Sequence, residues 1–271
     1  MKRLIYQVCL GAASQSKLYK HCIQSVANYC EAHGIDHHVQ TTPILRIKPD
    51  VFVTNRSTES YEKHGGFLPI YEKENAFDWF SKGYDQIAII DADIYIRPNS
   101  PNIFHDLGNN YDFGAVVERD MPITGAYAMK IKNYSHMQYN SLSDVKWDWR
   151  DWGAHFYNMG MIVMNRSITD FLHGESAQQF IRRAEFKRFV DGLNNWKWST
   201  DQTLLNWWVK KESSNPDLPM RVKDMHWTWN ALYSAVKDDQ IPKANFVHFF
   251  LKDKLPQNGE NVEELMKKIG E

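Results

Sequence analysis

The alternation of apolar and polar positions predicts an α/β protein from its first segment onwards. Residues 4–9 form a short apolar run typical of a buried strand, and Gly11 follows in a turn of small residues. Between Leu18 and Cys30 the apolar positions recur at helical spacing, and Gly34 supplies the C-terminal stop. Residues 35–39 predict a second strand. This strand–helix–strand opening indicates a Rossmann-like sheet.

The same alternation continues along the rest of the chain, with two interruptions. Further strands are predicted at residues 87–90, 111–118, 158–165 and 244–250, and further helices at 72–81, 175–190, 200–211 and 261–269. Residues 41–71 are broken repeatedly by proline and glycine. Residues 119–152 are long, aromatic and irregular, and an insertion of this size is usually functional or partly helical. Because no internal repeat, low-complexity tract or linker is visible, we expect one domain over residues 1–271.

Composition is ordinary for a soluble globular chain, with 24% charged residues and a net charge of −1. A net charge so close to zero argues against nucleic acid or an anionic membrane as a bulk electrostatic partner. No stretch is long and apolar enough to span a bilayer, which leaves peripheral membrane contact open. Cys9, Cys22 and Cys30 show neither metal spacing nor a C-x-x-C pair. We therefore expect reduced core thiols and a cytoplasmic protein.

A pair of carboxylates is the most informative feature of the chain. Asp91 and Asp93 close the apolar run at residues 87–90. Side chains at i and i+2 of a strand point the same way, and two like charges repel unless something cationic lies between them. A divalent metal carrying phosphates would fill that place. Taken alone the pair is a weak signal, because aspartate is also common in turns.

A metal held by two carboxylates usually needs a further protein ligand, and His248 is the candidate. It lies inside the apolar run 244–250, where a lone histidine is more often a core residue. Lys252 and Lys254 follow it, however, and a lysine at that spacing would place an ammonium group at a neighbouring phosphate. Carboxylates, one imidazole and diphosphate oxygens together suit Mn²⁺ or Mg²⁺.

Several blocks of the sequence, taken in order, resemble one known family. The blocks are a strand into Asp-x-Asp at residues 84–93, an Asn-x-Gly strand at 156–165, an Asp-Gln helix start at 200–206, and a terminal block with His248 and Lys254. In this order they are similar to the retaining glycosyltransferases of the glycogenin and bacterial lipopolysaccharide galactosyltransferase group, family 8. Trp229-Asn230 also resembles a feature of that family. Two departures are Leu251, where the family has glycine, and the aromatic insertion before Phe156.

The resemblance implies a glycosyltransferase A (GT-A) fold, which is a Rossmann-like, mixed and mostly parallel sheet flanked by helices. It implies metal-dependent transfer of a hexose from a nucleotide sugar, by default a UDP-sugar, to a glycan or other hydroxyl acceptor, with retention of configuration. On this basis the donor-binding half spans about residues 1–118, the acceptor region about 119–256, and the C-terminal helix 257–271.

By the same resemblance, residues at the blocks take roles toward the donor. Asp93 and His248 bind the metal directly, and Asp91 shares the metal and reaches the ribose. Lys254 stabilises the leaving phosphate, with Lys252 as the fallback. These assignments place a metal and a cation at the diphosphate, where charge develops as the donor breaks.

Lys73 lies on the predicted helix that leads into the Asp-x-Asp strand. It could touch the donor from there. An exposed helix lysine is the simpler interpretation.

The donor sugar needs partners for its hydroxyls, and Asn158 and Asp201 match family positions that supply them. A strand-end turn and a helix N-cap are equally good interpretations of these two residues. Gln202 matches the residue proposed to lie beneath the anomeric carbon. Because a neutral amide is a poor nucleophile, we favour a front-side route in which the leaving phosphate takes the acceptor proton. Inversion would instead need a carboxylate base, for which Glu118 and Asp120 are available.

An aromatic loop is the expected acceptor surface. Trp147, Trp149 and Trp152 alternate with four charged residues, and three tryptophans in such a setting cannot all be buried at low cost. Flat aromatic faces also stack on sugar rings, although most of the other aromatic residues are expected to serve the core.

Three other functions remain open on the sequence. A haloacid dehalogenase-type phosphatase also ends a strand with Asp-x-Asp, but residues 94–97 do not match its pattern. A non-catalytic protein could use the same fold to hold a glycan or nucleotide. A nucleotidyltransferase would need a glycine-rich basic loop after the first strand, which residues 11–17 resemble only faintly.

Overall fold

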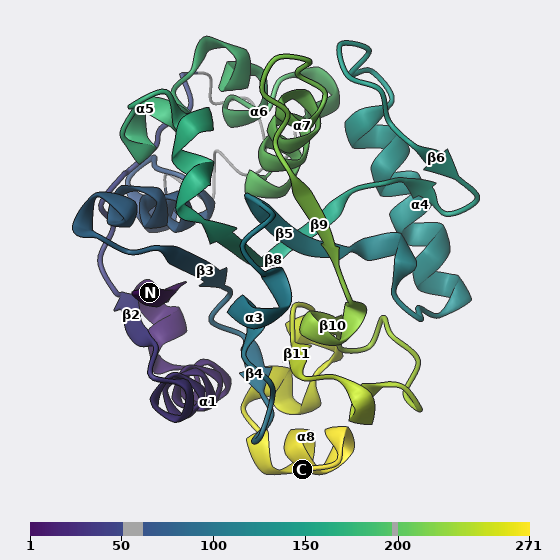
Figure 1. The fold of residues 1–271 in the computed structure, drawn as a ribbon. Coiled ribbons are helices and arrows are strands. Elements are labelled where there is room, and N and C mark those ends of the chain that lie inside the picture. Colours follow the sequence, from purple (N-terminus) through teal and green to yellow (C-terminus); the bar gives the residue numbers. More distant parts are fainter. Residues whose placement is uncertain (51–61, 197–199) are drawn as a thin grey trace.

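The computed structural model describes residues 1–50, 62–196 and 200–271 (Figure 1). A six-stranded sheet with the order β2-β1-β3-β8-β5-β9 forms its centre. Its strands are β1 (Arg3–Val8), β2 (Asp36–Gln40), β3 (Gln86–Ile90), β5 (Phe113–Val117), β8 (Tyr157–Asn165) and β9 (Val222–Met225). Strand β8 runs antiparallel to both neighbours, and the other pairs are parallel. The expected mixed, mostly parallel sheet is therefore confirmed.

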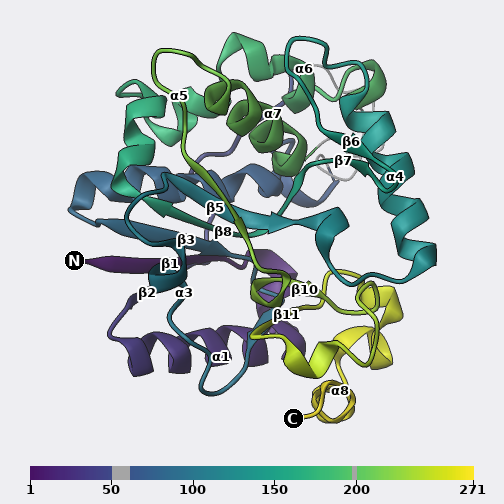
Figure 2. The same cartoon turned by 45° about the vertical axis from the view of Figure 1, so that its right-hand side comes forward.

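Helices cover both faces of this sheet (Figures 1 and 2). Helix α1 (Lys17–His33) lies on one face, and α5 (Ala177–Ile181), α6 (Lys187–Val190) and α7 (Asp201–Ser213) lie on the other. Along β1, Leu4 and Tyr6 belong to the hydrophobic cluster under α7, and Ile5 belongs to the cluster under α1. Strands buried on both faces read as continuous apolar runs, which is why the sequence identified them.

A second, smaller sheet lies beyond the end of β3. It consists of β10 (Ala231–Leu232), β11 (Phe246–His248) and β4 (Ile94–Ile96), with α8 (Val262–Ile269) close by. Strands β11 and β4 are antiparallel, and His248 pairs with Ile94. This pairing carries a residue from late in the chain to the segment that follows β3.

The remaining elements lie in the connections. They are α3 (Ile103–Leu107), α4 (Gly125–Tyr139), the two-stranded hairpin β6 (Trp149–Arg150) and β7 (Gly153–Ala154), and 3₁₀ helices at Gly11–Gln15, Pro69–Lys82, Glu118–Asp120, Arg166–Leu172, Ala184–Phe186, Asn194–Trp196, Trp227–Trp229, Ile241–Lys243, Lys252–Lys254 and Pro256–Gly259. No helix in the described ranges is long and apolar enough to cross a membrane. Cys9, Cys22 and Cys30 are buried free thiols, as expected.

Several predicted elements differ in detail. The single helix expected at residues 175–190 is broken, because Arg183 takes an extended backbone (φ −51°, ψ 139°) while its guanidinium donates to the Phe171 carbonyl. The segment expected as a helix at 72–81 is a 3₁₀ helix, which Gly83 ends in the left-handed conformation. Strand 244–250 is shorter than predicted, and α4 occupies much of the irregular stretch 119–152. Strand β9 and helix α3 were not predicted.

Candidate functional site

The two carboxylates lie in a tight turn rather than along a strand. Strand β3 ends at Ile90, and the amide of Ile94 donates to the carbonyl of Asp91 at 3.1 Å. The Asp91 amide donates to the carbonyl of Gly160 on the neighbouring β8 at 2.7 Å. Asp91 and Asp93 therefore follow the end of the strand, as expected, and the turn rather than strand alternation directs both acids to one place.

His248 joins these acids. Its Nε2 lies 3.3 Å from Oδ1 of Asp93 and 3.8 Å from Oδ2 of Asp91. One ligand atom from each of the three residues can be chosen so that all lie within 4.8 Å of one another. The imidazole is buried, with 4% of its residue surface exposed. Two carboxylates and one imidazole at this separation fit a single divalent cation of the Mn²⁺ or Mg²⁺ type.

Gly160 makes room for the imidazole. A Cβ atom placed on this glycine would lie 2.3 Å from Cε1 and 2.7 Å from Nδ1 of His248. The ring therefore rests directly against the backbone of β8. This close approach gives a physical reason for glycine in the Asn-x-Gly block.

The other ring nitrogen of His248 is held by Asn230. His248 Nδ1 lies 3.0 Å from Oδ1 of Asn230, and the Asn230 amide donates to Oδ1 of Asn158 at 2.9 Å. An Nδ1–H that donates to this oxygen leaves Nε2 as the nitrogen that faces the acids. In the sequence, Trp229-Asn230 is recognisable only by its resemblance to a family feature, and this role of Asn230 was not predicted. A polar residue that precedes a strand does not indicate, from the sequence, which side chain it will contact in the folded protein.

Burial and charges in the site shift the pKa values of the acids and of the imidazole in different directions. Burial would lower the pKa of His248, but the charge and hydrogen bond of Asp93, together with the charge of Asp91, raise it. Burial would raise the pKa of Asp93, but the charge and hydrogen bond of His248, with a backbone hydrogen bond and the charge of Lys252, lower it. Burial raises the pKa of Asp91. Without a cation, Asp93 and His248 thus form an ion pair, and a cation that binds at Nε2 must displace a proton.

Lys73 is buried between two carboxylates. Its Nζ lies 2.9 Å from Oδ1 of Asp91 and 2.8 Å from Oδ2 of Asp201, and it donates to the carbonyl of Met159 at 3.1 Å. Only 11% of the Lys73 side chain is exposed. Burial would lower its pKa, but Asp201 and Asp91 outweigh burial and raise it. The simpler interpretation of an exposed helix lysine was wrong.

Glu74 follows Lys73 and is completely buried. Neither of its carboxylate oxygens has a hydrogen-bond partner within the described part of the chain. Burial, and next the charge of Asp201, raise the pKa of Glu74 well above its usual value. Burial therefore disfavours the charged form of Glu74 at this site.

The start of α7 brings two more predicted residues to the same place. Thr200 caps the helix by accepting from the Gln202 amide at 3.2 Å, so Asp201 is free to reach Lys73. The Gln202 side chain accepts from the Met159 amide at 3.2 Å. Asn206 accepts from the Tyr157 amide and donates to its carbonyl, which fastens α7 to β8.

A cavity of about 220 Å³ lies beside these residues. Its polar side chains come from Glu118, Lys130, Asn158, Thr200 and Gln202, and its aromatic ones from Tyr127, Tyr134 and Phe250. Glu118 accepts from the Tyr127 hydroxyl and from the Asn158 amide, and burial raises its pKa. Asp120, the other expected base, has 53% of its side chain exposed beside Arg119 and does not line this cavity.

The two lysines after β11 differ in their surroundings. Lys252 Nζ lies 4.0 Å from the centre of the Tyr19 ring, and its charge adds to the lowering of the Asp93 pKa. Lys254 is exposed. Lys252 is therefore the lysine whose charge reaches the acids.

Comparison with known proteins identifies the fold. No family model and no curated protein matches the chain. A glycosyltransferase involved in glycosylation of the major capsid of PBCV-1 matches with a TM-score of 0.53 and 14% identity, over 97% of this chain and 100% of that one. Mouse xyloside xylosyltransferase 1 matches with a TM-score of 0.49 and 12% identity, over 94% of this chain and 100% of that one. The galactosyltransferase LgtC, solved with donor and acceptor sugar analogs, matches with a TM-score of 0.48 and 11% identity, over 98% of this chain and 95% of that one.

The chain has the GT-A glycosyltransferase fold. At this identity the likeness concerns the fold, and it confirms the fold expected from the sequence. In the GT-A sheet of this chain, Asp91 and Glu118 follow the carboxyl ends of β3 and β5. Because β8 runs the other way, Asn158 near its start lies at that same edge. Ligands of open α/β sheets bind beyond this edge.

The three tryptophans expected at the acceptor surface differ in their exposure. Trp147 is buried in the core, where its ring lies 4.4 Å from that of Tyr139. It therefore offers no surface to a ligand, which corrects the expectation for this residue. Trp149 and Trp152 are exposed, at 36% and 45%.

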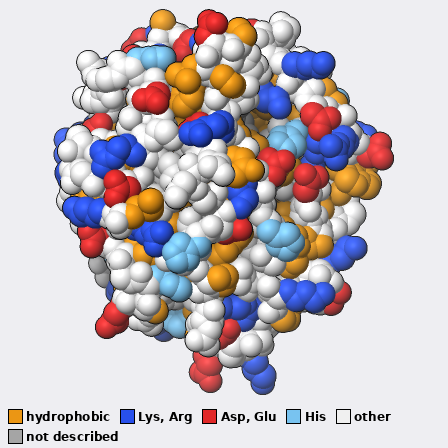
Figure 3. Space-filling model, viewed as in Figure 1, with side chains coloured by type: hydrophobic (Ala, Val, Ile, Leu, Met, Phe, Trp, Pro, Cys, Tyr) orange, Lys and Arg blue, Asp and Glu red, His pale blue; other side chains and the backbone are white. Residues whose placement is uncertain are grey.

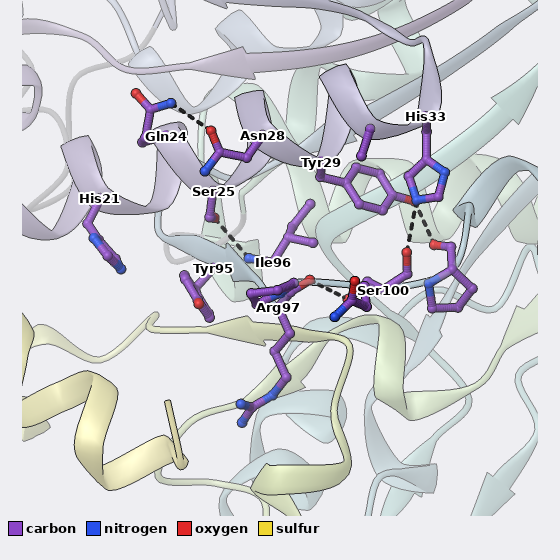
Figure 4. Close-up of a pocket in the computed structure, with 14 residues that line it drawn as sticks. His21, Gln24, Ser25, Asn28, Tyr29, His33, Tyr95, Ile96, Arg97 and Ser100 are labelled. Carbon is purple, nitrogen blue, oxygen red and sulfur yellow. Dashed lines mark hydrogen bonds between the residues drawn. The ribbon is translucent and has the colours of Figure 1, made fainter.

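A larger hollow of about 590 Å³ lies between α1 and the segment after β4 (Figure 4). Two of its polar contacts are internal: Gln24 donates to Asn28, and Ser25 accepts from the amide of Ile96. None of the residues that line it belongs to the group of acids and imidazole. We assign it no part in the site of this GT-A chain.

Proposed function

We propose that this chain is a metal-dependent glycosyltransferase that moves a hexose from a nucleotide sugar, with UDP as the expected nucleotide, to a hydroxyl of a glycan or other acceptor. The observation that carries the proposal is the convergence of Asp91, Asp93 and His248 at the ligand edge of a GT-A sheet. His248 lies far along the chain from the two acids. A histidine that served only the core would not need two carboxylates beside it.

The cation site would consist of Asp91, Asp93 and His248, with Mn²⁺ or Mg²⁺ as the ion that suits this donor set. A divalent cation bound there would neutralise the donor's diphosphate as it leaves. Asn230 keeps Nε2 of His248 directed to the site, and Gly160 lets the ring lie close to β8. Lys73 fixes one oxygen of Asp91, which leaves the other oxygen toward His248.

Other residues of the chain would bind the donor itself. Lys252 is better placed than Lys254 to neutralise the leaving phosphate, because its charge reaches Asp93. Asn158 and Asp201 would hold hydroxyls of the donor sugar. Gln202 lines the cavity together with Asn158, and its side-chain oxygen accepts from the amide of Met159.

Transfer with retention fits the neutral character of Gln202. In this route the bond from the anomeric carbon to the phosphate oxygen breaks, and the acceptor oxygen bonds to the same face of that carbon. The acceptor proton passes to the leaving phosphate oxygen. Gln202 would stabilise the positive charge that develops on the sugar.

Inversion is the alternative, and one observation keeps it open. Glu118 presents a buried carboxyl group with a raised pKa to the cavity, and such a group suits a general base near neutral pH. The anomeric configuration of the new glycosidic bond, read by proton NMR, separates the two routes.

A thermal-shift panel of nucleotide sugars, with and without Mn²⁺, tests the function. UDP-hexoses should stabilise the wild type only with the metal, and Asp93→Asn should lose the effect. Asp239→Asn, which removes an exposed carboxylate elsewhere, should behave as wild type. Metal-dependent hydrolysis of a UDP-sugar would exclude a purely binding protein. Phosphate release from a phosphomonoester without any nucleotide sugar would instead support a phosphatase.

A further inference from the structure

Glu118 stands at one end of a series of side-chain contacts that reaches His248. It follows β5, has only 4% of its residue surface exposed, and lines the cavity beside the site. Both of its carboxyl oxygens are bound within the protein: one accepts from the Tyr127 hydroxyl, and the other accepts from the Asn158 side chain at 3.1 Å. A carboxyl group bound on both sides is held in one orientation, and it also fixes the orientation of its partners.

A backbone group fixes the direction of the Asn158 amide. The N–H of Gly160 can only donate, and it donates to the side-chain oxygen of Asn158 at 3.0 Å. The placement of oxygen and nitrogen in this amide therefore does not depend on a choice between two equivalent side-chain networks. With its oxygen on Gly160, the amide must direct its nitrogen to Glu118, which supplies the acceptor.

The direction of this amide also determines how the next one lies. The Asn158 oxygen is 2.9 Å from the side-chain nitrogen of Asn230, which must donate there. The oxygen of Asn230 is then left for Nδ1 of His248 at 3.0 Å, so this ring nitrogen carries a hydrogen. Together the two amides reserve Nε2 of His248 for the acids and for a cation.

A second series of contacts connects Glu118 with the same imidazole. Tyr127, whose hydroxyl donates to Glu118, lies edge-on to Phe250 with ring centres 5.9 Å apart. Phe250 in turn lies edge-on to His248 with ring centres 5.7 Å apart. The amide contacts and the aromatic contacts thus start from different oxygens of one carboxyl group and meet at one ring.

Removal of the Glu118 acceptor would leave the buried Asn158 amide in an unfavourable arrangement. An N–H that is buried without an acceptor costs about 1–3 kcal/mol. Asn158 would then gain by turning its nitrogen toward another acceptor. Such a turn would take its oxygen away from Gly160 and Asn230, and the orientation of the His248 imidazole would no longer be fixed.

We propose that Glu118 is a positioning residue of the cation site, because it holds the amides of Asn158 and Asn230 in the direction that keeps Nε2 of His248 available to a divalent cation. This inference rests on the proposed function, to which the cation site belongs. It gives Glu118 a role other than the base of an inverting reaction. An amide oxygen accepts a hydrogen bond as a carboxyl oxygen does, so glutamine can fill the positioning role but cannot serve as the base.

Two variants of the full-length chain separate these roles, with Mn²⁺ affinity measured by electron paramagnetic resonance. Glu118→Gln keeps an oxygen for Asn158 and a polar group for the Tyr127 hydroxyl, so its Mn²⁺ affinity should stay close to that of wild type. Glu118→Ala removes the acceptor, and its affinity should fall roughly 10- to 100-fold, the usual effect of losing an outer partner of a metal ligand.

Hydrolysis of the UDP-hexose that gives the largest thermal shift supplies a second readout. Its rate should fall less than about tenfold in Glu118→Gln, whereas loss of a general base typically costs about 10²- to 10⁴-fold. This comparison decides between the two roles even if Glu118→Ala does not fold, as judged by circular dichroism.

Surface carboxylates supply the control. On the face drawn in Figure 3, acidic side chains lie among basic and hydrophobic ones. Glu31 is an exposed carboxylate on α1, and Glu31→Ala should bind Mn²⁺ as wild type does. Tyr127→Phe removes one hydroxyl and keeps the ring that contacts Phe250, so it should weaken Mn²⁺ binding less than Glu118→Ala does.

Three results would overturn the inference. They are a folded Glu118→Ala that binds Mn²⁺ as tightly as wild type, a Glu118→Gln that binds Mn²⁺ as weakly as Glu118→Ala, and a Glu118→Gln with normal Mn²⁺ affinity whose hydrolysis is at least about 100-fold slower. The last result would assign Glu118 as the base. Failure of the proposed function is recognised separately, because wild type itself would then show no Mn²⁺-dependent hydrolysis of UDP-sugars.

Discussion

The imidazole Nδ1 of His248 lies 3.0 Å from the side-chain oxygen of Asn230. This contact decides which nitrogen faces Asp93, because a ring nitrogen that donates to an amide oxygen cannot serve as a metal ligand. Asn230 is in turn bound to Asn158, and Asn158 to Glu118. One chain of hydrogen bonds thus links the cavity to the acids. Asn230 acts as a positioning residue, since it acts through His248.

Replacing Asn230 tests this link. We expect Asn230→Ala to weaken Mn²⁺ binding about 10- to 100-fold, as the loss of such outer partners typically does. Asn230→Asp keeps an oxygen near Nδ1 and should retain more of the affinity. Titration of free Mn²⁺ by electron paramagnetic resonance measures both variants, with Asn28→Ala on the exposed side of α1 as the control. Equal affinities for Asn230→Ala and wild type would show that the contact has no such role.

Gly160 offers an independent test of the same geometry. A methyl group at this position would lie 2.3 Å from Cε1 of His248, so Gly160→Ala must push the ring away from β8. We expect Mn²⁺ affinity to fall at least tenfold in the same titration. Gly125→Ala, where a Cβ atom meets nothing within 4 Å, should leave the affinity unchanged. If Gly160→Ala binds Mn²⁺ as tightly as wild type, the ring position described above is incorrect.

The pH dependence of cation binding follows from the pKa of His248. Asp93 raises this pKa above its ordinary value of about 6.5, and a protonated Nε2 cannot bind a metal. Affinity for Mn²⁺ should therefore be constant at high pH and fall, by up to about tenfold per pH unit, below the raised pKa. Calorimetry in two buffers of different ionisation enthalpy should detect proton release at pH 6. Affinity that stays constant down to pH 5 would argue against His248 as a ligand.

The pKa shifts of His248 and Asp93 also make the stability of the metal-free protein depend on pH. The folded-state pKa of His248 is raised, so its ion pair stabilises the fold below about pH 6.5, and this contribution is lost as pH rises through the raised value. The pKa of Asp93 is lowered, so its contribution is present above about pH 3.9 and is lost as pH falls through the lowered value. The pair thus contributes most between these limits.

Lys73 and Asp201 form a buried ion pair, with 11% and 4% of their side chains exposed. Replacing Lys73 by methionine removes the cation from two carboxylates, and loss of one partner of a buried pair typically costs about 3–5 kcal/mol. We expect Lys73→Met to lower the free energy of unfolding in urea by an amount of that order. The loss should be reduced by the hydration that the Asp91 carboxylate gains once Lys73 no longer binds it. The double variant Lys73→Met/Asp201→Asn should be less destabilised than the sum of the two single variants. Additive effects would mean that the two side chains do not interact.

The sequence predicted the main strands and the convergence of Asp91, Asp93 and His248 for a physical reason. Strands buried on both sides appear as apolar runs, and functional residues follow where those runs end. Asp91, Asp93 and Asn158 could therefore be found from pattern and resemblance. His248 could be found because its apolar strand is followed by lysines.

Other features depend on packing that no local pattern records. Lys73 is buried because the 3₁₀ helix that carries it turns this side chain toward Asp91 and Asp201. Trp147 is buried because α4, which forms in the stretch expected to be functional or partly helical, places Tyr139 beside it. In both cases a side chain was expected to be exposed because it, or the residues next to it in the sequence, carry charge.

Direct measurement of the cation tests the central claim most closely. Titration of Mn²⁺ into the wild type should show one ion per chain, with tighter binding when UDP is present. Asp91→Asn, Asp93→Asn and His248→Ala should each weaken that binding at least tenfold and abolish the effect of UDP. If His248→Ala binds Mn²⁺ and UDP as the wild type does, the acids and the imidazole do not share a cation, and the account is contradicted.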